Sequence, residues 1–220
     1  MSGPRSCIVA VDGPAASGKT TLARRLAAEF GLAFLDTGLL YRAVARRLLD
    51  RGLALDDVRA AVAAAEALAP ADLAASGLRG EAVSQGASKV AALPAVRQAL
   101  LAFQRSFGEG GAGAVLAGRD IGTVVRPDAD RKIFVTATPE ERARRRCREL
   151  QARGGSSIYQ RVLMDLRERD ARDQSRAVAP LLPAGDALVI DTTDKDIDTA
   201  FALARAYVAG AARRHPGRPV

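Results

Sequence analysis

The sequence predicts an α/β fold in which helices cover both faces of a parallel, five-stranded sheet. Five short apolar runs alternate with longer segments whose apolar residues recur at helical spacing. The runs are mostly apolar, without the alternation of a half-exposed strand, as expected of parallel strands buried on both faces. They are residues 7–11, 33–35, 114–117, 132–136 and 187–191. A chain of 220 residues, 48% of them hydrophobic, can build one such core with a small insert but not two large domains.

A glycine-rich segment follows the first predicted strand and carries a phosphate-binding pattern. Residues 13–20 read GPAASGKT, in which the glycines allow backbone N–H groups to converge on phosphate oxygens. Lys19 would reach the β- and γ-phosphates, and the Thr20 hydroxyl can ligate Mg²⁺. A predicted helix over residues 21–30 adds its positive N-terminal end. The segment predicts a nucleoside triphosphate site. For Asp12, just before it, we expect a structural role, with contact to metal-bound water as the alternative.

The other elements follow from apolar spacing and from helix breakers. Residues 39–51 have helical periodicity, whereas residues 55–75 are so rich in alanine that they support helix weakly and suggest no chemistry. In the helix that follows Pro94, the residues expected to face a core are Val96, Leu100 and Phe103. Helices are predicted over residues 82–92 and 95–107, and from residues 139, 158 and 196 onward.

Composition limits the function classes. The net charge of +8 and the isoelectric point near 10.3 suit a nucleic acid or an anionic small substrate, because basic residues are spread along the whole chain. Cys7 and Cys147 lack metal-ligand spacing, which fits a reduced cytosolic protein without a zinc site. We expect no signal peptide or membrane span, and a disordered basic tail at residues 213–220, which includes His215.

Two motifs in the first half of the chain supply arginine to a possible second anionic ligand. Residues 37–42 place the Thr37 hydroxyl at a helix N-terminus with Arg42 one turn later. This pattern fits phosphate binding or, equally well, a helix cap beside a surface arginine. Residues 87–97 contain Ser88 and Arg97, and alone they indicate an ordinary helix break.

Two motifs in the second half complete the set. Arg119 and Asp120 directly follow a strand, where Arg119 could hold phosphate and Asp120 accept from an amino group; an ion pair between the two is the alternative. Arg169, Asp173 and Arg176 are spaced i, i+4 and i+7, so on a helix they share one face and can meet one ligand. The alternative is a set of solvated ion pairs.

Between these last two motifs, the sequence predicts a lid. Two helices joined by Gly154 and Gly155 carry an arginine-rich run over residues 140–148. Lid closure would bring arginines to a phosphoryl-transfer transition state and exclude water. RNA binding by this run is the rival interpretation, and it is less favoured because aromatic residues are 4% of the chain and none lie within the run.

Taken together, these motifs closely resemble those of bacterial cytidylate kinases over nearly the whole chain. The more specific segments are residues 118–129 and 176–181. The resemblance implies a P-loop three-layer α/β/α sandwich in a single kinase domain over residues 1–220. Within it, the resemblance implies a short helical CMP-binding insert at residues 55–107 and a lid at residues 140–176.

The resemblance also implies an activity: phosphorylation of CMP or dCMP by ATP with Mg²⁺, in a cytoplasmic monomer that binds neither nucleic acid nor membrane. The implied catalytic residues are Lys19, Arg119 and Arg176, with Thr20 near Mg²⁺ mostly through ATP and water. The implied ATP-binding residues are Gly13, Pro14, Ala15, Ala16, Ser17, Gly18, Lys19, Thr20 and Thr21. The implied CMP-binding residues are Thr37, Arg42, Ser88, Arg97, Arg119, Asp120, Arg169, Asp173 and Arg176.

The implied base readers have suitable chemistry. Ser88, Arg97 and Asp120 would face cytosine, whose N4 amino group donates while N3 and O2 accept. Uracil would turn a carbonyl toward Asp120 and leave that group unpaired, which rejects the wrong base. No general base is required, because the attacking phosphate oxygen is already ionised at neutral pH.

The chain departs from the family pattern in its insert, since residues 67–80 are short and rich in alanine where the family usually has a longer piece. Thr37 stands where the family often has serine, which preserves the hydroxyl. A different P-loop small-molecule kinase is the first alternative, and the Asp120 motif argues against it. An RNA-associated NTPase or regulatory GTPase is less favoured, because guanine-reading and switch motifs are not found in suitable context.

Overall fold

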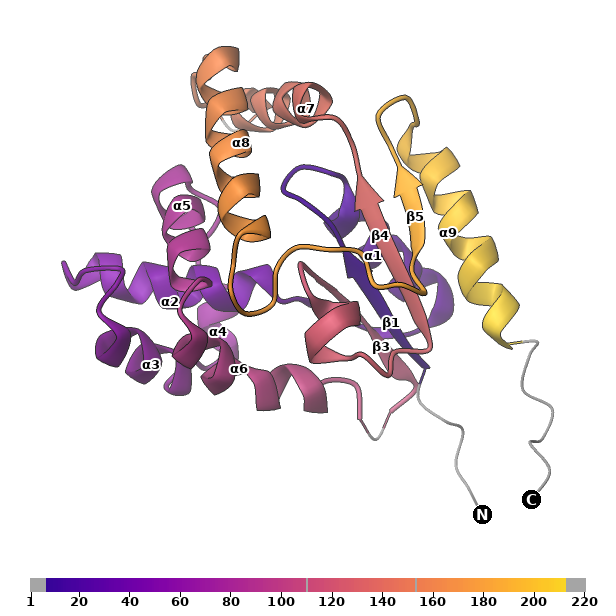
Figure 1. Ribbon diagram of the computed structural model, residues 1–220, viewed down its shortest axis with the longest axis horizontal. Helices are drawn as coiled ribbons and strands as arrows, with labels where there is room; N and C mark the ends of the chain where they lie inside the picture. The colour runs from indigo at the N-terminus through magenta and orange to yellow at the C-terminus, as the bar shows by residue number, and fades with distance from the viewer. Residues whose placement is uncertain (1–6, 110, 153, 213–220) are drawn as a thin grey trace.

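The computed structural model describes residues 7–109, 111–152 and 154–212, and within these ranges five strands form one parallel sheet (Figure 1). The strand order is β2-β3-β1-β4-β5, and every neighbouring pair is parallel. Each strand coincides with a predicted apolar run to within a residue or two. The strands are β1 (Cys7–Asp12), β2 (Ala33–Asp36), β3 (Gly113–Gly118), β4 (Arg131–Thr136) and β5 (Leu188–Asp191).

Helices cover both faces of this sheet, which confirms the predicted three-layer α/β/α fold. On one face, α1 (Lys19–Phe30) and α9 (Ile197–Ala212) pack on alternate residues of β1, such as Val9 and Val11. On the other face, Ile8 and Ala10 pack with the π-helical turn η1 (Ile121–Val125) and with α6. Successive residues of a strand point to opposite faces, so one apolar strand supplies both layers.

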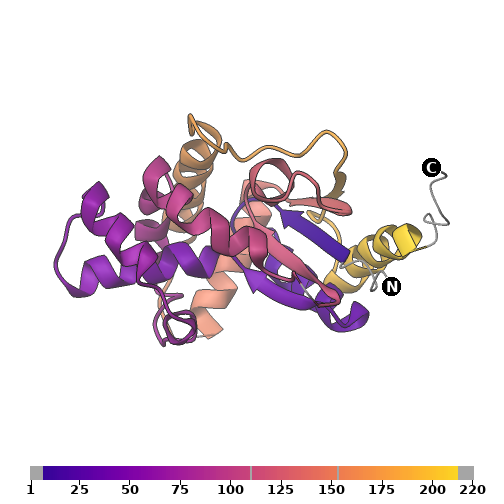
Figure 2. The same ribbon diagram turned by 90° about the horizontal axis from the view of Figure 1, so that it is seen from below.

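A second core lies beside the sheet, within the helices that follow β2. Figure 2 shows these purple and magenta helices on one side of the sheet and the yellow α9 on the other. Leu40, Val44 and Leu48 of α2 pack on helices from the alanine-rich segment, whose residues Ala61 and Ala64 allow close approach. The helices are α2 (Gly38–Asp50), α3 (Val58–Glu66), α4 (Pro70–Leu73), α5 (Glu81–Val90) and α6 (Pro94–Ser106).

One core prediction in α6 is wrong. Val96 and Leu100 are buried as expected, but Phe103 is 46% exposed and its ring lies 6.3 Å from that of Phe107. The face that α6 buries continues from Leu100 to Gln104, whose side chain donates to the Leu100 carbonyl at 3.1 Å. The helix therefore keeps an i, i+4 register at its buried face, and Phe103 falls beside it.

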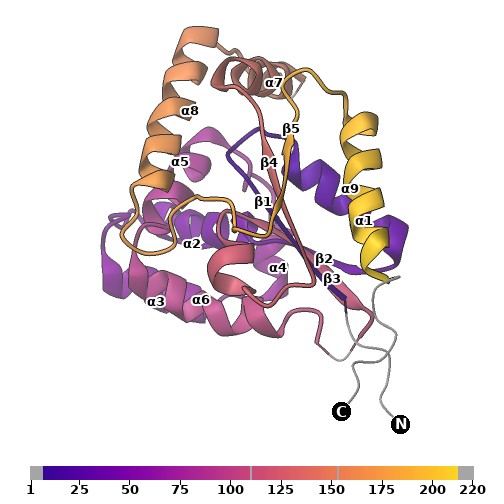
Figure 3. The same ribbon diagram turned by 45° about the vertical axis from the view of Figure 1, so that its right-hand side comes forward.

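The predicted lid segment forms two helices, α7 (Pro139–Ala152) and α8 (Tyr159–Gln174), which pack on each other through Ala143, Cys147 and Leu163. Figure 3 shows α8 standing beside α5 of the insert. Because α8 ends at Gln174, the expectation that Arg176 lies on this helix is wrong. The chain turns back there, and the Leu181 amide donates to the Asp173 carbonyl at 2.9 Å.

The basic tail predicted at residues 213–220, with His215, lies outside the described residues. Among the residues that are described, no helix is both long and apolar enough to cross a membrane.

Candidate functional site

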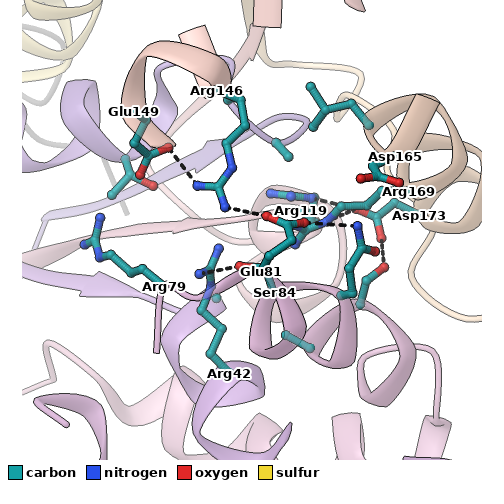
Figure 4. Close-up of a pocket in the computed structure, with 18 of the residues that line it drawn as sticks. Arg42, Arg79, Glu81, Ser84, Arg119, Arg146, Glu149, Asp165, Arg169 and Asp173 are labelled. Atoms are coloured by element: carbon teal, nitrogen blue, oxygen red, sulfur yellow. Dashed lines mark hydrogen bonds and ion pairs between the residues drawn. The ribbon is translucent and has the colours of Figure 1, made fainter. Parts of the chain in front are cut away.

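A cavity of about 790 Å³ opens at the carboxyl ends of β1, β2 and β3, and it is lined by residues of α2, α5, α7 and α8 as well (Figure 4). Lys19 follows β1, Thr37 follows β2 and Arg119 follows β3, and all three line this cavity. The carboxyl ends of parallel strands are where open α/β sheets bind ligands. The parallel topology thus brings together motifs that are about 20 to 100 residues apart in sequence.

The glycine-rich segment forms a tight loop at one end of the cavity. A Cβ on Gly13 would lie 2.0 Å from the Val135 carbonyl oxygen, so only glycine fits there. Gly18 has a positive φ of 90° and leads into α1. The Lys19 ammonium donates to the Pro14 carbonyl at 3.1 Å. Burial, with a smaller effect of nearby Arg119, holds the pKa of Lys19 well below its ordinary value, so an anion at this loop would stabilise its charged form.

The predicted ATP residues divide into two groups. The cavity is lined by Ala15, Ala16, Gly18, Lys19, Thr20 and Thr21. Gly13, Pro14 and Ser17 do not line it and instead support the loop from behind: the carbonyls of Gly13 and Pro14 accept hydrogen bonds, and Ser17 is fully buried. Within the described residues the Ser17 hydroxyl has no hydrogen-bond partner.

In the motif after β2, the Thr37 hydroxyl bonds to the neighbouring strand β3 and not to the helix that follows it. The Thr37 hydroxyl donates to the Ala117 carbonyl at 2.9 Å and makes no hydrogen bond that caps α2. Arg42 is not a free surface arginine, because it donates to the Leu78 carbonyl at 3.0 Å and to the Ser84 hydroxyl at 2.9 Å. Burial lowers the pKa of Arg42. Both side chains line the cavity.

Arg97 and Asp120, which both line the cavity, form a buried ion pair. Arg97 also donates to the Ala91 carbonyl at 3.2 Å, and its guanidinium lies 5.6 Å from the centre of the Tyr41 ring. The alternative of an ion pair between Arg119 and Asp120 is wrong, since each pairs with a partner from another element. Ser88 lines the same region of the cavity.

Asp173 is the centre of an arginine cluster in the middle of the site (Figure 4). Its carboxylate accepts from Arg119 at 2.9 Å and from Arg176, and it lies 3.9 Å from Arg169. Asp173 is 1% exposed, so the alternative of solvated ion pairs is wrong. Burial opposes the charged carboxylate, but the three arginines more than offset it and lower the pKa of Asp173.

The cluster carries more positive charge than Asp173 neutralises. Burial, reinforced by Arg119, lowers the pKa of Arg169 to about 9. In the described part of the chain, Arg169 Nε has no hydrogen-bond partner. A buried guanidinium without a full set of partners is stabilised by an incoming anion such as phosphate, which arginine binds bidentately. The cluster is therefore a candidate phosphate site.

Several lining residues escaped the sequence analysis. Figure 4 shows Glu81 of α5 paired with Arg146 of α7, at 2.8 Å, which joins the insert to the lid. Arg145 of α7 donates to the Thr192 carbonyl at 2.5 Å, close to the P-loop. The arginine run at residues 140–148 predicted a lid, but its five arginines gave no signal for which of them face the cavity. Other lining residues without a sequence signal are Asp36, Arg79, Gln85, Glu149, Arg161, Asp165 and Glu168.

One cavity thus holds a triphosphate loop and, a short way along it, an arginine cluster suited to a second phosphorylated ligand. Fold and site together define a P-loop phosphotransferase, because two anionic ligands bound in one cavity can exchange a phosphoryl group.

Comparison with known proteins gives the family. The model of the cytidylate kinase family matches residues 9–208. A cytidylate kinase of Paramagnetospirillum magneticum is 60% identical over 202 residues, covering 90% of this chain and 96% of that protein. One of Methylocella silvestris is 58% identical over 204 residues, covering 93% and 94%. The chain belongs to the cytidylate kinase family.

Solved structures show the same fold. A crystal structure of an uncharacterized protein from Eubacterium ventriosum superposes with a TM-score of 0.57 at 16% identity, covering 94% of this chain and 99% of that one. At this identity the likeness concerns the fold alone.

Proposed function

We propose that this protein transfers the γ-phosphoryl group of ATP to CMP or dCMP, yielding ADP and CDP or dCDP. The observation that carries the proposal is the buried Arg97–Asp120 pair, which lines the same cavity as the P-loop and the Asp173 cluster. Membership of the cytidylate kinase family supports it. The cavity combines a P-loop, an arginine cluster and a buried carboxylate, which suit a triphosphate, an acceptor phosphate and a base.

In this mechanism the P-loop holds ATP and the arginine cluster holds the acceptor. Backbone N–H groups of the loop, which line the cavity from Ala15 onward, surround the phosphates, and Lys19 exchanges the Pro14 carbonyl for a phosphate oxygen. Arg42, Arg119 and Arg176 bind the CMP phosphate with Thr37 beside them. Arg169 and Asp173 approach the pentose. The reaction needs alignment and charge stabilisation, not a general base, because the attacking oxygen is already ionised.

The residues present fit Mg²⁺ that arrives with ATP. The Thr20 hydroxyl and the Asp36 carboxylate both line the P-loop end of the cavity and are oxygen donors of the kind Mg²⁺ prefers. In the described ranges, no group of three or more His, Cys, Asp or Glu side chains could hold a metal ion by itself. This fits an ion held mainly by substrate phosphates and water, which in phosphoryl transfer neutralises developing charge.

We infer that Asp120 selects the base. Its carboxylate keeps acceptor capacity beside Arg97, and the cytosine N4 amino group supplies the matching donor. Uracil offers a carbonyl oxygen at that position, so the remaining acceptor of Asp120 would face a second acceptor in a buried site. Ser88 lies on the same side and donates to Asp173 at 3.3 Å, so it links base and pentose ends.

We further propose that residues 55–107 act as the CMP-binding insert and residues 140–176 as the lid of one kinase domain. We also propose that the protein acts as a monomer. We propose a cytoplasmic location and a role in pyrimidine nucleotide metabolism, which the proposed use of free cytosine nucleotides supports.

The test is a coupled ADP-release assay with MgATP and CMP, dCMP, UMP or AMP, on wild type and Asp120→Asn. We expect strong turnover of CMP and dCMP, and a preference for CMP over UMP that falls by about tenfold to a hundredfold in the variant, as expected when one paired buried group is lost. Asp128→Asn is the control, since Asp128 pairs with Arg126 in an exposed position nearby. Turnover of none of the four nucleotides would reject the proposal and favour another acceptor.

A further inference from the structure

Asp12 joins the P-loop strand to the turn that carries Arg119 and Asp120. Its two carboxylate oxygens accept from consecutive backbone amides, Ile121 N and Gly122 N, each at 2.8 Å. Asp12 is the last residue of β1, directly before the P-loop, and it is 5% exposed. The role is structural, as expected from the sequence, but its partners are more than a hundred residues away in the chain.

These two amides need an acceptor. They are the first two N–H groups of η1, and the first N–H groups of a helical turn have no partner within it. The Asp120 side chain, at the position before the turn, makes no capping hydrogen bond and pairs with Arg97 instead. The Asp12 carboxylate, at the end of the neighbouring strand β1, caps the turn in place of Asp120. Negative charge is favoured at this end of a helical turn.

A second contact fastens the same turn. Arg119 donates to the Gly13 carbonyl at 3.0 Å, while its Nε atom pairs with Asp173. The segment of Arg119 and Asp120 is therefore held at two points. The Arg119 side chain binds Gly13 of the P-loop, and the two amides that follow Asp120 bind Asp12. The position of these two side chains relative to the P-loop depends on the two attachments.

We propose that Asp12 is a positioning residue for the acceptor nucleotide, which holds Arg119 and Asp120 in register with the P-loop. The inference rests on the proposed function, because it concerns the site where CMP would bind. Asp12 acts through the backbone and does not line the cavity. Loss of its carboxylate would displace the acceptor end, whereas the P-loop backbone keeps other supports, since Thr192 donates to the Ser17 carbonyl and Arg142 to the Ala15 carbonyl.

The test compares wild type with Asp12→Asn, which keeps the shape but leaves one amide facing an NH₂ group. We expect the KM for CMP to rise by about tenfold or more and the CMP-over-UMP ratio of kcat/KM to fall, because small displacements of positioning groups have effects of this size. The KM for ATP should change by less than about twofold. A change in the KM for CMP alone distinguishes the positioning of one ligand from a loss of structure that affects both.

Asp130→Asn is the matched control. Asp130 also accepts from a backbone amide of β1, Ile8 N at 2.8 Å, but at the end of the strand far from the site. This variant should leave both KM values unchanged. If Asp12→Asn does not fold, Asp12→Glu is measured in its place; if neither folds, Asp12 is a folding determinant and the positioning role is rejected.

Two results overturn the inference: an unchanged KM for CMP with unchanged base preference, or a parallel loss of ATP and CMP binding. Failure of the proposed function is seen separately, as absent CMP turnover by wild type. In that case the amide hydrogen exchange of Ile121 and Gly122, read by NMR in wild type and variant, still decides whether Asp12 holds the turn.

Discussion

At the scale of single residues, buried charge is the main feature of this protein. Asp173, Arg119, Arg169 and Arg176 lie in one cluster, and breaking a buried ion pair from one side leaves an unpaired charge that costs about 3–5 kcal/mol. Asp12 is a second buried carboxylate, held by backbone amides. Burying a charged group lowers the stability of the folded protein, because the group loses its hydration. The size of this effect depends on pH, since protonation removes the charge of a carboxylate.

The pH dependence of stability is a test at this scale. Burial, reinforced by Asp120 and opposed by the two amides and by Lys19, raises the pKa of Asp12 from 3.8 to about 7. The folded state therefore holds the proton more tightly than the unfolded state. The stabilisation from Asp12 is full below pH 3.8 and is lost as the pH rises through about 7. Asp12→Asn lacks this dependence.

We therefore expect the unfolding free energy of Asp12→Asn, relative to wild type, to rise between pH 5 and pH 7 by up to about 1.4 kcal/mol per pH unit and to level off near pH 8. Urea unfolding of both proteins at each pH measures this difference in free energy. The contributions of all other titrating groups are the same in both proteins and cancel in the difference. Parallel stability curves would show that Asp12 does not titrate in this range.

At the scale of elements, α5 contacts the two helices of the proposed lid, α7 and α8. Glu81 pairs with Arg146, and Ser88 donates to Asp173 of α8 at 3.3 Å. The Glu81 carboxylate is half-exposed, and Arg146 has a second partner, Glu149, at 2.9 Å. Loss of the Glu81 contact should therefore cost little stability and act mainly on the closure of α7 over α5.

For Glu81→Gln, we expect amide hydrogen exchange in α7 and α8 to become several-fold faster in the ligand-free protein, with the unfolding free energy changed by less than about 1 kcal/mol. Mass spectrometry of peptides from the exchanged protein measures the exchange of α7 and α8 separately. Glu29→Gln is the control, because Glu29 and Arg205 form an exposed pair between α1 and α9. Equal exchange in all three proteins would show that this ion pair does not hold the lid.

At the scale of the whole molecule, the basic character of the chain is concentrated at the site. Eleven lysine and arginine side chains line the cavity against seven carboxylates. The excess of four is half of the net charge of +8, which an anionic substrate explains without a nucleic acid. Binding of such a ligand should stabilise the entire fold, because the sheet, insert and lid all contribute to the cavity wall.

We expect CMP at about 100 times its Kd to raise stability by about 2.7 kcal/mol, and the melting temperature by about 5–10 °C. Added NaCl should reduce the shift. A thermal melt with and without CMP measures it. Arg176→Gln should lose most of the shift, whereas Arg205→Gln, on the exposed surface of α9, should keep it. A shift that survives in Arg176→Gln would mean that CMP binds elsewhere.

Local patterns in the sequence were sufficient for the framework. The five strands, the P-loop and the helices around it follow from apolar runs, glycine positions and spacing, since each is determined by neighbouring residues. The strand positions also predicted that the site residues lie at one edge of the sheet, because parallel strands place the residues that follow them side by side. Every predicted CMP residue, from Thr37 to Arg176, lines the cavity.

The pairing of charges was decided only by the tertiary structure. Asp120 pairs with Arg97 and not with its neighbour Arg119, and Asp12 caps a turn more than a hundred residues away. Among 29 arginines the sequence holds no local signal for such choices, because a long flexible side chain reaches partners from several elements. Burial in the assembled fold removes water as the competing partner, and each charge then takes the partner that packing places beside it.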